Sequence, residues 1–242
     1  MLIFNGIGAS LELLEPFTES LTGIETIVFD APGVGGSERK RWPYRMKRLA
    51  RLADRMLDHL GYEQVDALGL SWGGAVAQQF ARTFPKRCRR LILAATTPGV
   101  TMVPGSPFVL SKMLNPRRFN DLEYLRRIAP ELYGGEIRRD PRLVDQHGAH
   151  MHRPNLLGYL YQQLAFCSWS SLWWLPLIKQ QTLVLAGKDD PLVPVANARI
   201  LAALIPRSRL YLFEDGHLFL LSPSQLALPI IERFLAEPVL AT

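Results

Sequence analysis

A short pattern in the first third of the chain constrains its fold more than any other feature. The pentapeptide Gly69–Gly73, with the sequence Gly-Leu-Ser-Trp-Gly, follows the apolar run Val65–Leu68 and precedes a helical stretch at 74–81. A serine between a strand and a helix sits on a strained turn, which requires small neighbours where a side chain would collide with either element. The two glycines of the pentapeptide and Gly74 supply that room. The pattern therefore predicts a nucleophilic Ser71 presented at the end of a strand.

Strands and helices alternate at both ends of the chain. Apolar runs predict strands at 2–4, 26–29, 65–68, 90–94, 182–186 and 210–213. Helices are expected at 11–21, 44–60, 74–81, 195–204 and about 226–235. Continuous apolar strands that alternate with helices are typical of a parallel sheet covered on both faces. The expected fold class is therefore α/β, with a mostly parallel sheet and helices on both faces.

The alternation breaks between Gly99 and about Ile178, where prolines, arginines and aromatic residues become more frequent. Short helical pieces are expected there at 122–129 and 156–166. We interpret this segment as a helical cap inserted before the strand that carries the acid, over the sheet edge where such folds bind ligands. The expected organisation is a core at 1–98, a cap or lid at 99–178 and a second core part at 179–242.

The first expected strand is unusually short. It has about three residues after Met1, against a usual length of about five or six. This start suggests that an upstream strand pair of the fold is missing.

A serine hydroxyl needs a base that takes its proton and an acid that orients the base. The candidate bases are five histidines: His59, His147, His150, His152 and His217. His59 lies on an amphipathic helix, and three others lie in the expected cap. His217 follows the last expected strand, at the sheet edge where the serine emerges, so we expect His217 to be the base rather than a structural loop histidine.

The acid is expected between serine and histidine, after another strand. Asp189 and Asp190 follow the strand at 182–186, and a helix-capping role is the alternative for either. Asp190 is favoured because Gly187, Asp190 and Pro194 form a G-x-x-D-x-x-x-P frame that is usual in such folds. The resulting chain order, Ser then Asp then His, is that of the α/β-hydrolase fold.

Two backbone amides are needed to stabilise the negative charge that develops on a substrate oxygen. The amide of Trp72, directly after the serine, is one candidate. The second is expected in the loop Asn5–Gly8 after the first strand, at Ile7. Asn5 occupies the position where many hydrolases have histidine. The sequence fits equally well with a second role, in which Asn5 is a turn residue that caps the next helix.

Composition and charge restrict the classes of protein to which the chain can belong. The 242 residues carry a net charge of +6, but the basic residues are dispersed. The densest stretch is Arg39–Arg55. An apolar helix face is expected there at Leu49, Leu52, Ala53, Met56, Leu57 and Leu60, and the arginines of the opposite face are interpreted as solvated, with at most weak affinity for anionic surfaces. No apolar run is long enough to span a membrane, and no signal peptide is recognisable. Two cysteines make no disulfide framework. We expect a cytoplasmic protein that binds no nucleic acid.

Three further patterns carry no cofactor or metal prediction. Gly33–Gly36 lacks the third glycine of a dinucleotide loop. His147, His150 and His152 have no cysteine or well-spaced acid to complete a metal site. The expected cap contains three tryptophans, Trp169, Trp173 and Trp174. They are interpreted as part of the apolar core of the cap; the alternative is a surface that binds acyl chains or contacts a polymer.

With these residues in place, the whole chain resembles the α/β-hydrolases. Within them it is similar to the intracellular depolymerases of medium-chain poly(3-hydroxyalkanoate). The serine–acid–histidine frame is shared across the superfamily, whereas three segments are narrower: Asn5–Ala9, Tyr133–Gly135 and Gly216–Leu220. Members of this family carry about thirty residues before the Asn-Gly-Ile-Gly loop, and they are absent here.

The resemblance implies Ser71 as nucleophile, Asp190 as orienting acid and His217 as general base. The implied substrate is an aliphatic polyester or a medium-chain 3-hydroxyacyl ester, cleaved through an acyl-enzyme, with a polyester granule in the cytoplasm as a partner. An acyltransferase or a general carboxylesterase with the same triad is one alternative. A non-catalytic granule-binding protein is another.

Overall fold

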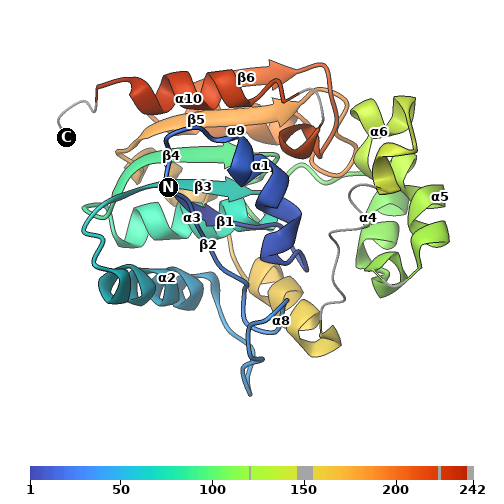
Figure 1. Cartoon of the computed structure of the whole chain (residues 1–242), viewed down its shortest axis with the longest axis horizontal. Coiled ribbons are helices and arrows are strands. Elements are labelled where there is room, and N and C mark those ends of the chain that lie inside the picture. The colour runs from blue at the N-terminus through green and yellow to red at the C-terminus, as the bar shows by residue number, and fades with distance from the viewer. Residues whose placement is uncertain (120, 146–154, 223–224, 239–242) are drawn as a thin grey trace.

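The computed structural model describes the chain except residues 120, 146–154, 223–224 and 239–242. Within the described residues, six strands form one sheet in the order β2-β1-β3-β4-β5-β6, and every neighbouring pair is parallel (Figure 1). The strands are β1 Leu2–Phe4, β2 Ile27–Val28, β3 Val65–Leu70, β4 Cys88–Ala94, β5 Gln181–Gly187 and β6 Ser208–Phe213. The predicted α/β class with a parallel sheet is confirmed.

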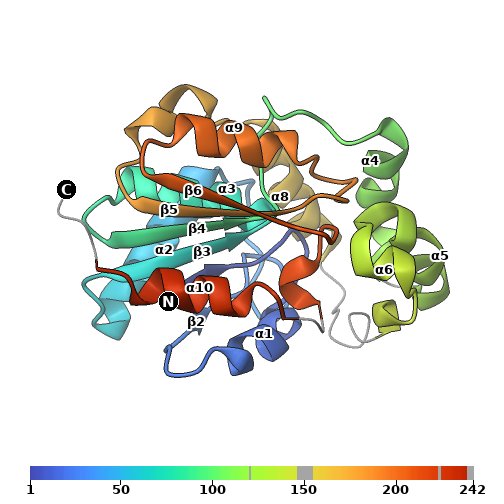
Figure 2. The ribbon, with the colours of Figure 1, turned by 90° about the horizontal axis from the view of Figure 1, so that it is seen from above.

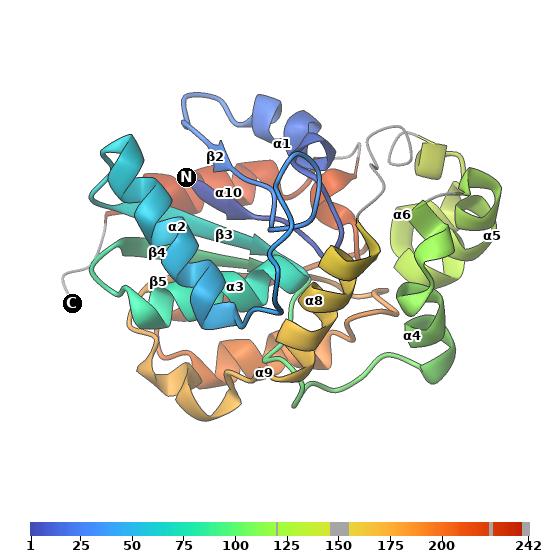
Figure 3. The same ribbon diagram turned by 90° about the horizontal axis from the view of Figure 1, so that it is seen from below.

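Helices cover both faces of the sheet. The helices α2 Met46–Leu60, α3 Trp72–Thr83 and α9 Ala196–Leu204 pack on one face (Figure 3). The helices α1 Glu15–Ser20 and α10 Leu228–Ala236 pack on the other (Figure 2). Successive strand residues alternate between the two apolar cores, with Leu91 and Leu93 in one and Ile92 in the other. This explains why the strands read as continuous apolar runs.

The segment between β4 and β5, residues 95–180, is called the inserted segment below. It contains α4 Pro107–Leu114, α5 Leu122–Tyr133, α6 Gly135–Arg139 and α8 Leu156–Cys167, with the 3-10 turns η2 Pro116–Phe119 and η3 Leu172–Leu177. Figure 2 shows α4, α5 and α6 beyond the carboxyl ends of the strands. The two expected helices are present, whereas α4 and α6 were not predicted. The division into core and cap remains an interpretation.

Three local predictions need correction. The expected helix at 11–21 is divided into the 3-10 turn η1 Leu11–Leu14 and α1, because Pro16 near the start of α1 has no N–H to continue the turn before it. The second strand has two residues instead of four. On α2, Leu49, Ala53 and Leu57 are buried as expected, but Leu52 and Leu60 are exposed.

The basic helix face and the membrane prediction can also be compared with the structure. Arg48, Arg51 and Arg55 of α2 are exposed, as a solvated face requires. Among the described residues, no helix is both long and apolar enough to cross a membrane.

Candidate active site

Ser71 lies at the junction of β3 and α3, where the chain turns sharply. Its backbone has φ 53° and ψ −120°, a conformation that side-chain-bearing residues rarely adopt. The turn is held by the Ser71 amide, which donates to Ala94 O at 2.8 Å, and by Thr96 Oγ1, which donates to Ser71 O at 2.6 Å. The strand–turn–helix predicted from the pentapeptide is therefore present, with the serine at the carboxyl end of a central strand.

The glycines around the serine are required by close contacts. A Cβ at Gly73 would lie 2.1 Å from Phe4 O, and one at Gly74 would lie 2.3 Å from Thr96 Oγ1. Both distances are far below van der Waals contact, so only glycine allows α3 to start this close to β1 and to the end of β4.

Ser71, His217 and Asp190 form a continuous hydrogen-bonded chain. His217 Nε2 lies 3.0 Å from Ser71 Oγ, and His217 Nδ1 lies 2.7 Å from Asp190 Oδ2. A carboxylate only accepts, so Nδ1 carries the proton and donates to Asp190, which leaves Nε2 to accept from the serine hydroxyl. The structure thus brings together the three side chains selected from sequence, in the arrangement that activates a serine.

The structure separates the two candidate acids. The Asp190 side chain is fully buried, and its Oδ1 accepts from the amides of Leu192 at 2.9 Å and Val193 at 2.8 Å. Asp189 instead faces away from the histidine, accepts from the Gly135 amide at 2.8 Å and pairs with Arg138. Only Asp190 is placed to orient His217.

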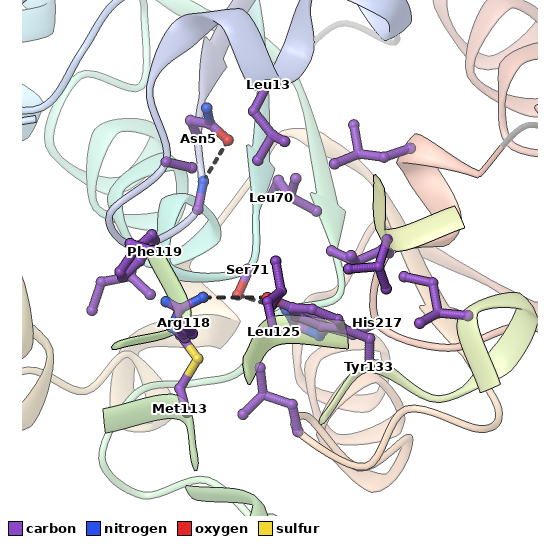
Figure 4. Close-up of a pocket in the computed structure, with 18 residues that line it drawn as sticks. Asn5, Leu13, Leu70, Ser71, Met113, Arg118, Phe119, Leu125, Tyr133 and His217 are labelled. Atoms are coloured by element: carbon purple, nitrogen blue, oxygen red, sulfur yellow. Dashed lines mark hydrogen bonds between the residues drawn. The ribbon is translucent and has the colours of Figure 1, made fainter. Parts of the chain in front are cut away.

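A largely apolar pocket lies over the serine and the histidine (Figure 4). Ser71 and His217 line it, and Arg118 contributes its one fixed charge among the described residues. The other lining residues are mainly aliphatic or aromatic: Leu13, Leu70, Met113, Phe119, Leu125, Tyr133, Ile137, Val144, Leu192, Leu218 and Leu221. Such a lining suits an aliphatic ligand.

The two expected amide donors flank this pocket. Trp72 is the first residue of α3, so its N–H has no acceptor within the helix. Ile7 lines the pocket, in a loop that Asn5 holds by accepting from the Gly6 amide and donating to Ser10 O, both at 2.7 Å. Asn5 is therefore a loop-forming residue here. Oxyanion binding by Ile7 and Trp72 remains a proposal.

Gln162 of α8 joins these two loops, and sequence reasoning did not identify it. Its side-chain oxygen accepts from the Gly8 amide at 2.8 Å, and its backbone oxygen accepts from Trp72 Nε1 at 3.0 Å. Gln162 is 1% exposed. The inserted segment thus fixes the loop of Ile7 relative to the turn of Ser71.

The segment Tyr133–Gly135, at the end of α5, packs directly on the loops that carry Asp189 and His217. The His217 amide donates to Tyr133 O at 2.7 Å, and the two rings stack with centroids 6.4 Å apart. A Cβ at Gly135 would lie 1.9 Å from Gly216 N, and one at Gly134 would lie 2.0 Å from Asp189 O. The glycines allow backbone to touch backbone at this joint.

We therefore expect Gly135→Ala to be strongly destabilising. Gly135 has φ +53° and no room for a Cβ, whereas Gly61 has φ +79° with nothing within 4 Å of a Cβ. Gly61→Ala is the matched control for backbone strain alone, at about 1–2 kcal/mol. Gly135→Ala should lower the free energy of unfolding in urea by at least about 3 kcal/mol. Equal losses in the two variants would show that the joint tolerates a side chain.

The other patterns singled out in the sequence lie away from the pocket. His59 is exposed on α2, and the histidine group at 147, 150 and 152 lies outside the described residues. Trp169 is buried and donates to Gln79 Oε1 at 2.9 Å, and Trp174 packs against it. Trp173 is 83% exposed. None of the three tryptophans lines the pocket, so the acyl-binding alternative is not supported.

The two cysteines differ in their environment and give a pH-dependent prediction. Burial raises the pKa of the Cys88 thiol, with a further contribution from the charge of Asp66, whereas Cys167 is exposed. Because the pKa is raised by folding, the thiol favours the native state below the unfolded pKa of about 8.5, and this contribution is lost as the pH rises above it. A disulfide reagent at pH 8 should modify Cys167 alone in native protein and both thiols in urea. Modification of both at equal rates in native protein would contradict this.

The chain matches a known protein family and is similar in sequence or in fold to several known proteins. Residues 1–222 match the family described as "alpha/beta hydrolase fold". The poly(3-hydroxyalkanoate) depolymerase of Ectopseudomonas oleovorans is 52% identical over 238 residues, which are 98% of this chain and 84% of that protein. The 2-hydroxymuconate semialdehyde hydrolase of Pseudomonas putida is 30% identical over 86% of this chain and 75% of that protein. The crystal structure of an enol-lactonase from Burkholderia xenovorans has a TM-score of 0.82 at 22% identity, over 98% of this chain and 90% of that one.

The parallel sheet, the serine turn and these matches define one class of protein: the chain belongs to the α/β-hydrolase family. Within that family, the predicted resemblance to the poly(3-hydroxyalkanoate) depolymerases is confirmed by the 52% identity. The prediction of an enzyme that hydrolyses carboxylic esters is confirmed by the same relative.

Proposed function

We propose that the chain is a serine esterase that hydrolyses aliphatic polyester or medium-chain 3-hydroxyacyl esters. The observation that carries the proposal is the hydrogen-bonded chain from Asp190 through His217 to Ser71 beneath an apolar pocket. The named activity of the 52% identical relative supports the choice of substrate. Each methylene of an acyl chain that enters such a pocket contributes about 0.8 kcal/mol, which favours medium-chain over short-chain esters.

In the proposed reaction, Ser71 Oγ attacks the ester carbonyl carbon while His217 Nε2 takes the hydroxyl proton. The oxyanion that forms accepts hydrogen bonds from the amides of Ile7 and Trp72. His217 then donates its proton to the departing alkoxide oxygen, and the ester C–O bond breaks to leave an acyl-enzyme. Water attacks the acyl-enzyme as His217 takes one of its protons. The bond between the acyl carbon and Ser71 Oγ then breaks, His217 returns the proton to Ser71 Oγ, and the acid is released.

Asp190 has a separate task in this reaction. During each attack the imidazole becomes positively charged, and the buried carboxylate stabilises that charge. The two backbone amides on its other oxygen keep Asp190 fixed, so the neutral imidazole carries its proton on Nδ1 before each attack.

We also propose that α8 contacts the surface of the polyester granule. Its outward stripe Leu156, Leu160 and Leu164 is 62%, 43% and 46% exposed. The opposite side of the same helix carries Gln162, which holds the loops beside the serine. A polyester surface on this stripe would therefore be separated from those loops by the width of one helix, about 10 Å.

The Leu160→Glu/Leu164→Glu variant should sediment with polyester particles several-fold less than the Arg51→Glu control, and equal sedimentation would contradict this contact.

The test of the esterase function is release of 3-hydroxy acids from a suspension of medium-chain polyhydroxyalkanoate. Protein treated with a fluorophosphonate serves as the inactive control, and mass spectrometry of its peptides locates the adduct. We expect release by untreated protein only, with the adduct on Ser71. An adduct on Ser71 with cleavage of soluble esters but no release from polymer would replace the polyester substrate by a general carboxylic ester. No adduct and no hydrolysis would overturn the enzymatic proposal.

A further inference from the structure

The pocket contains a buried arginine that the proposed reaction does not use. Arg118 lies in η2, is 4% exposed and lines the pocket together with Ser71 and His217 (Figure 4). Its guanidinium carbon is 3.9 Å from the centre of the Phe119 ring. A positive charge is costly to bury unless it is paired or hydrogen-bonded, so its presence here calls for a partner.

Within the described residues, the side chains that accept hydrogen bonds from this guanidinium are neutral. Arg118 Nη1 donates to Tyr133 Oη at 3.2 Å, and Nη2 donates to Tyr159 Oη at 3.3 Å. The Nε atom is buried and has no acceptor among the described residues. None of the ion pairs found within the described part of the chain includes Arg118, and the undescribed positions hold no aspartate or glutamate.

Among the described residues, one other arginine is as deeply buried, and it has the usual kind of partner. Arg90 is also 4% exposed, but its guanidinium faces the buried Asp66 at 3.4 Å. Arg118 is thus a buried cation whose counter-ion is not provided by the described protein, at the wall of a pocket that faces the serine.

A guanidinium has five N–H donors, and two of them are occupied by the tyrosines. The tyrosines leave donors on Nη1 and Nη2 free as well as the Nε–H, and the planar fork of a guanidinium matches the two oxygens of a carboxylate. The rest of the pocket is apolar apart from the serine, the histidine, Asn5 and Tyr133. The ligand that fits is an aliphatic ester that also carries a free carboxylate.

We propose that Arg118 is the receptor for the carboxylate of the substrate and makes the enzyme selective for carboxylate-terminated oligoesters of hydroxy acids. This inference rests on the proposed esterase function. In such an oligoester the last ester oxygen is separated from the terminal carboxyl carbon by only two carbons, so one molecule can reach both Arg118 and Ser71. Arg118 therefore determines specificity and takes no part in bond making.

The test compares two soluble substrates that differ only in this group: the dimer of 3-hydroxyoctanoate with a free carboxylate, and the same dimer with a terminal primary amide. Wild-type protein should have a higher kcat/KM for the acid than for the amide. In Arg118→Met the ratio of the two kcat/KM values should fall by about 10- to 100-fold, mainly through KM for the acid, as expected for hydrogen bonds to a charged group. Arg118→Lys should restore part of the ratio.

Arg117→Met is the matched control, because Arg117 is the preceding residue and its side chain is 58% exposed. Its acid-to-amide ratio should equal that of wild type. A merely structural role of Arg118 predicts that Arg118→Met loses activity equally on both substrates, and that result would overturn the inference.

A measurement on wild-type protein covers the case in which Arg118→Met does not fold. The acid 3-hydroxyoctanoate should inhibit p-nitrophenyl octanoate hydrolysis competitively, at concentrations at least tenfold lower than its amide. Equal inhibition would reject carboxylate recognition while leaving the esterase in place. Failure to hydrolyse any of these esters would instead reject the proposed function.

Discussion

Replacing Ser71 by alanine should lower kcat for a soluble medium-chain ester by about 10⁶-fold. The variant keeps the backbone turn, because alanine differs from serine only by the hydroxyl. It loses the one oxygen that lies 3.0 Å from His217 Nε2, so no acyl-enzyme forms. The residual rate should come from the pocket and the backbone amides, which still bind the ester.

The measurement is single-turnover hydrolysis of p-nitrophenyl octanoate, with far-UV circular dichroism to show that the variant is folded. The double variant Ser71→Ala/Asp190→Asn should be no slower than Ser71→Ala, because residues that act as one unit have non-additive effects. A loss below about 100-fold in folded Ser71→Ala would mean that another group is the nucleophile.

Replacing Asp190 by asparagine should lower kcat by about 10⁴-fold. The amide has nearly the same shape, but its NH₂ group can face His217 Nδ1 and force the proton onto Nε2. The histidine then presents a donor to the serine hydroxyl and can no longer accept its proton. Asparagine also removes the negative charge that stabilises the imidazolium.

Asp189→Asn is the matched control, because Asp189 is adjacent in sequence but contacts Gly135 and Arg138 instead of the histidine. We expect it to keep kcat within about threefold, since its ion pair with Arg138 is half-exposed and such pairs contribute little. Comparable losses in the two variants would contradict the assignment of Asp190 as the orienting acid.

Much of the frame that positions the site could be predicted from the sequence because its signals are local. The strand before Ser71, the glycines after it and the helix that follows occupy one continuous stretch, so pattern and steric demand coincide. Asp190 and His217 could be selected because each follows an apolar strand, and parallel strands end at the same edge of a sheet.

The residues that complete the site could not be found in this way. Gln162 and Arg118 belong to the inserted segment, and their partners are distant in sequence: Gly8 lies 154 residues from Gln162, and Tyr159 lies 41 residues from Arg118. Neither residue stands in a pattern with its partner. Their roles follow from burial and hydrogen bonding, which only the folded chain reveals.

The choice between Asp189 and Asp190 could be predicted only in part from the sequence. The spacing of Gly187, Asp190 and Pro194 favoured the correct neighbour of the histidine, but either carboxylate could have capped the helix that follows. The structure adds the reason: Asp189 is occupied by the amide of Gly135, which belongs to the inserted segment.

The joint between Tyr133–Gly135 and the loops of Asp189 and Gly216 bears on how this fold can be recombined. A chimaera that takes residues 95–180 from one relative and the sheet from another would bring together two backbones that touch with no side chain between them. Swapping the inserted segment alone should therefore yield inactive protein unless the two loops are transplanted with it. In such an exchange the inserted segment and the two loops therefore have to be treated as one unit.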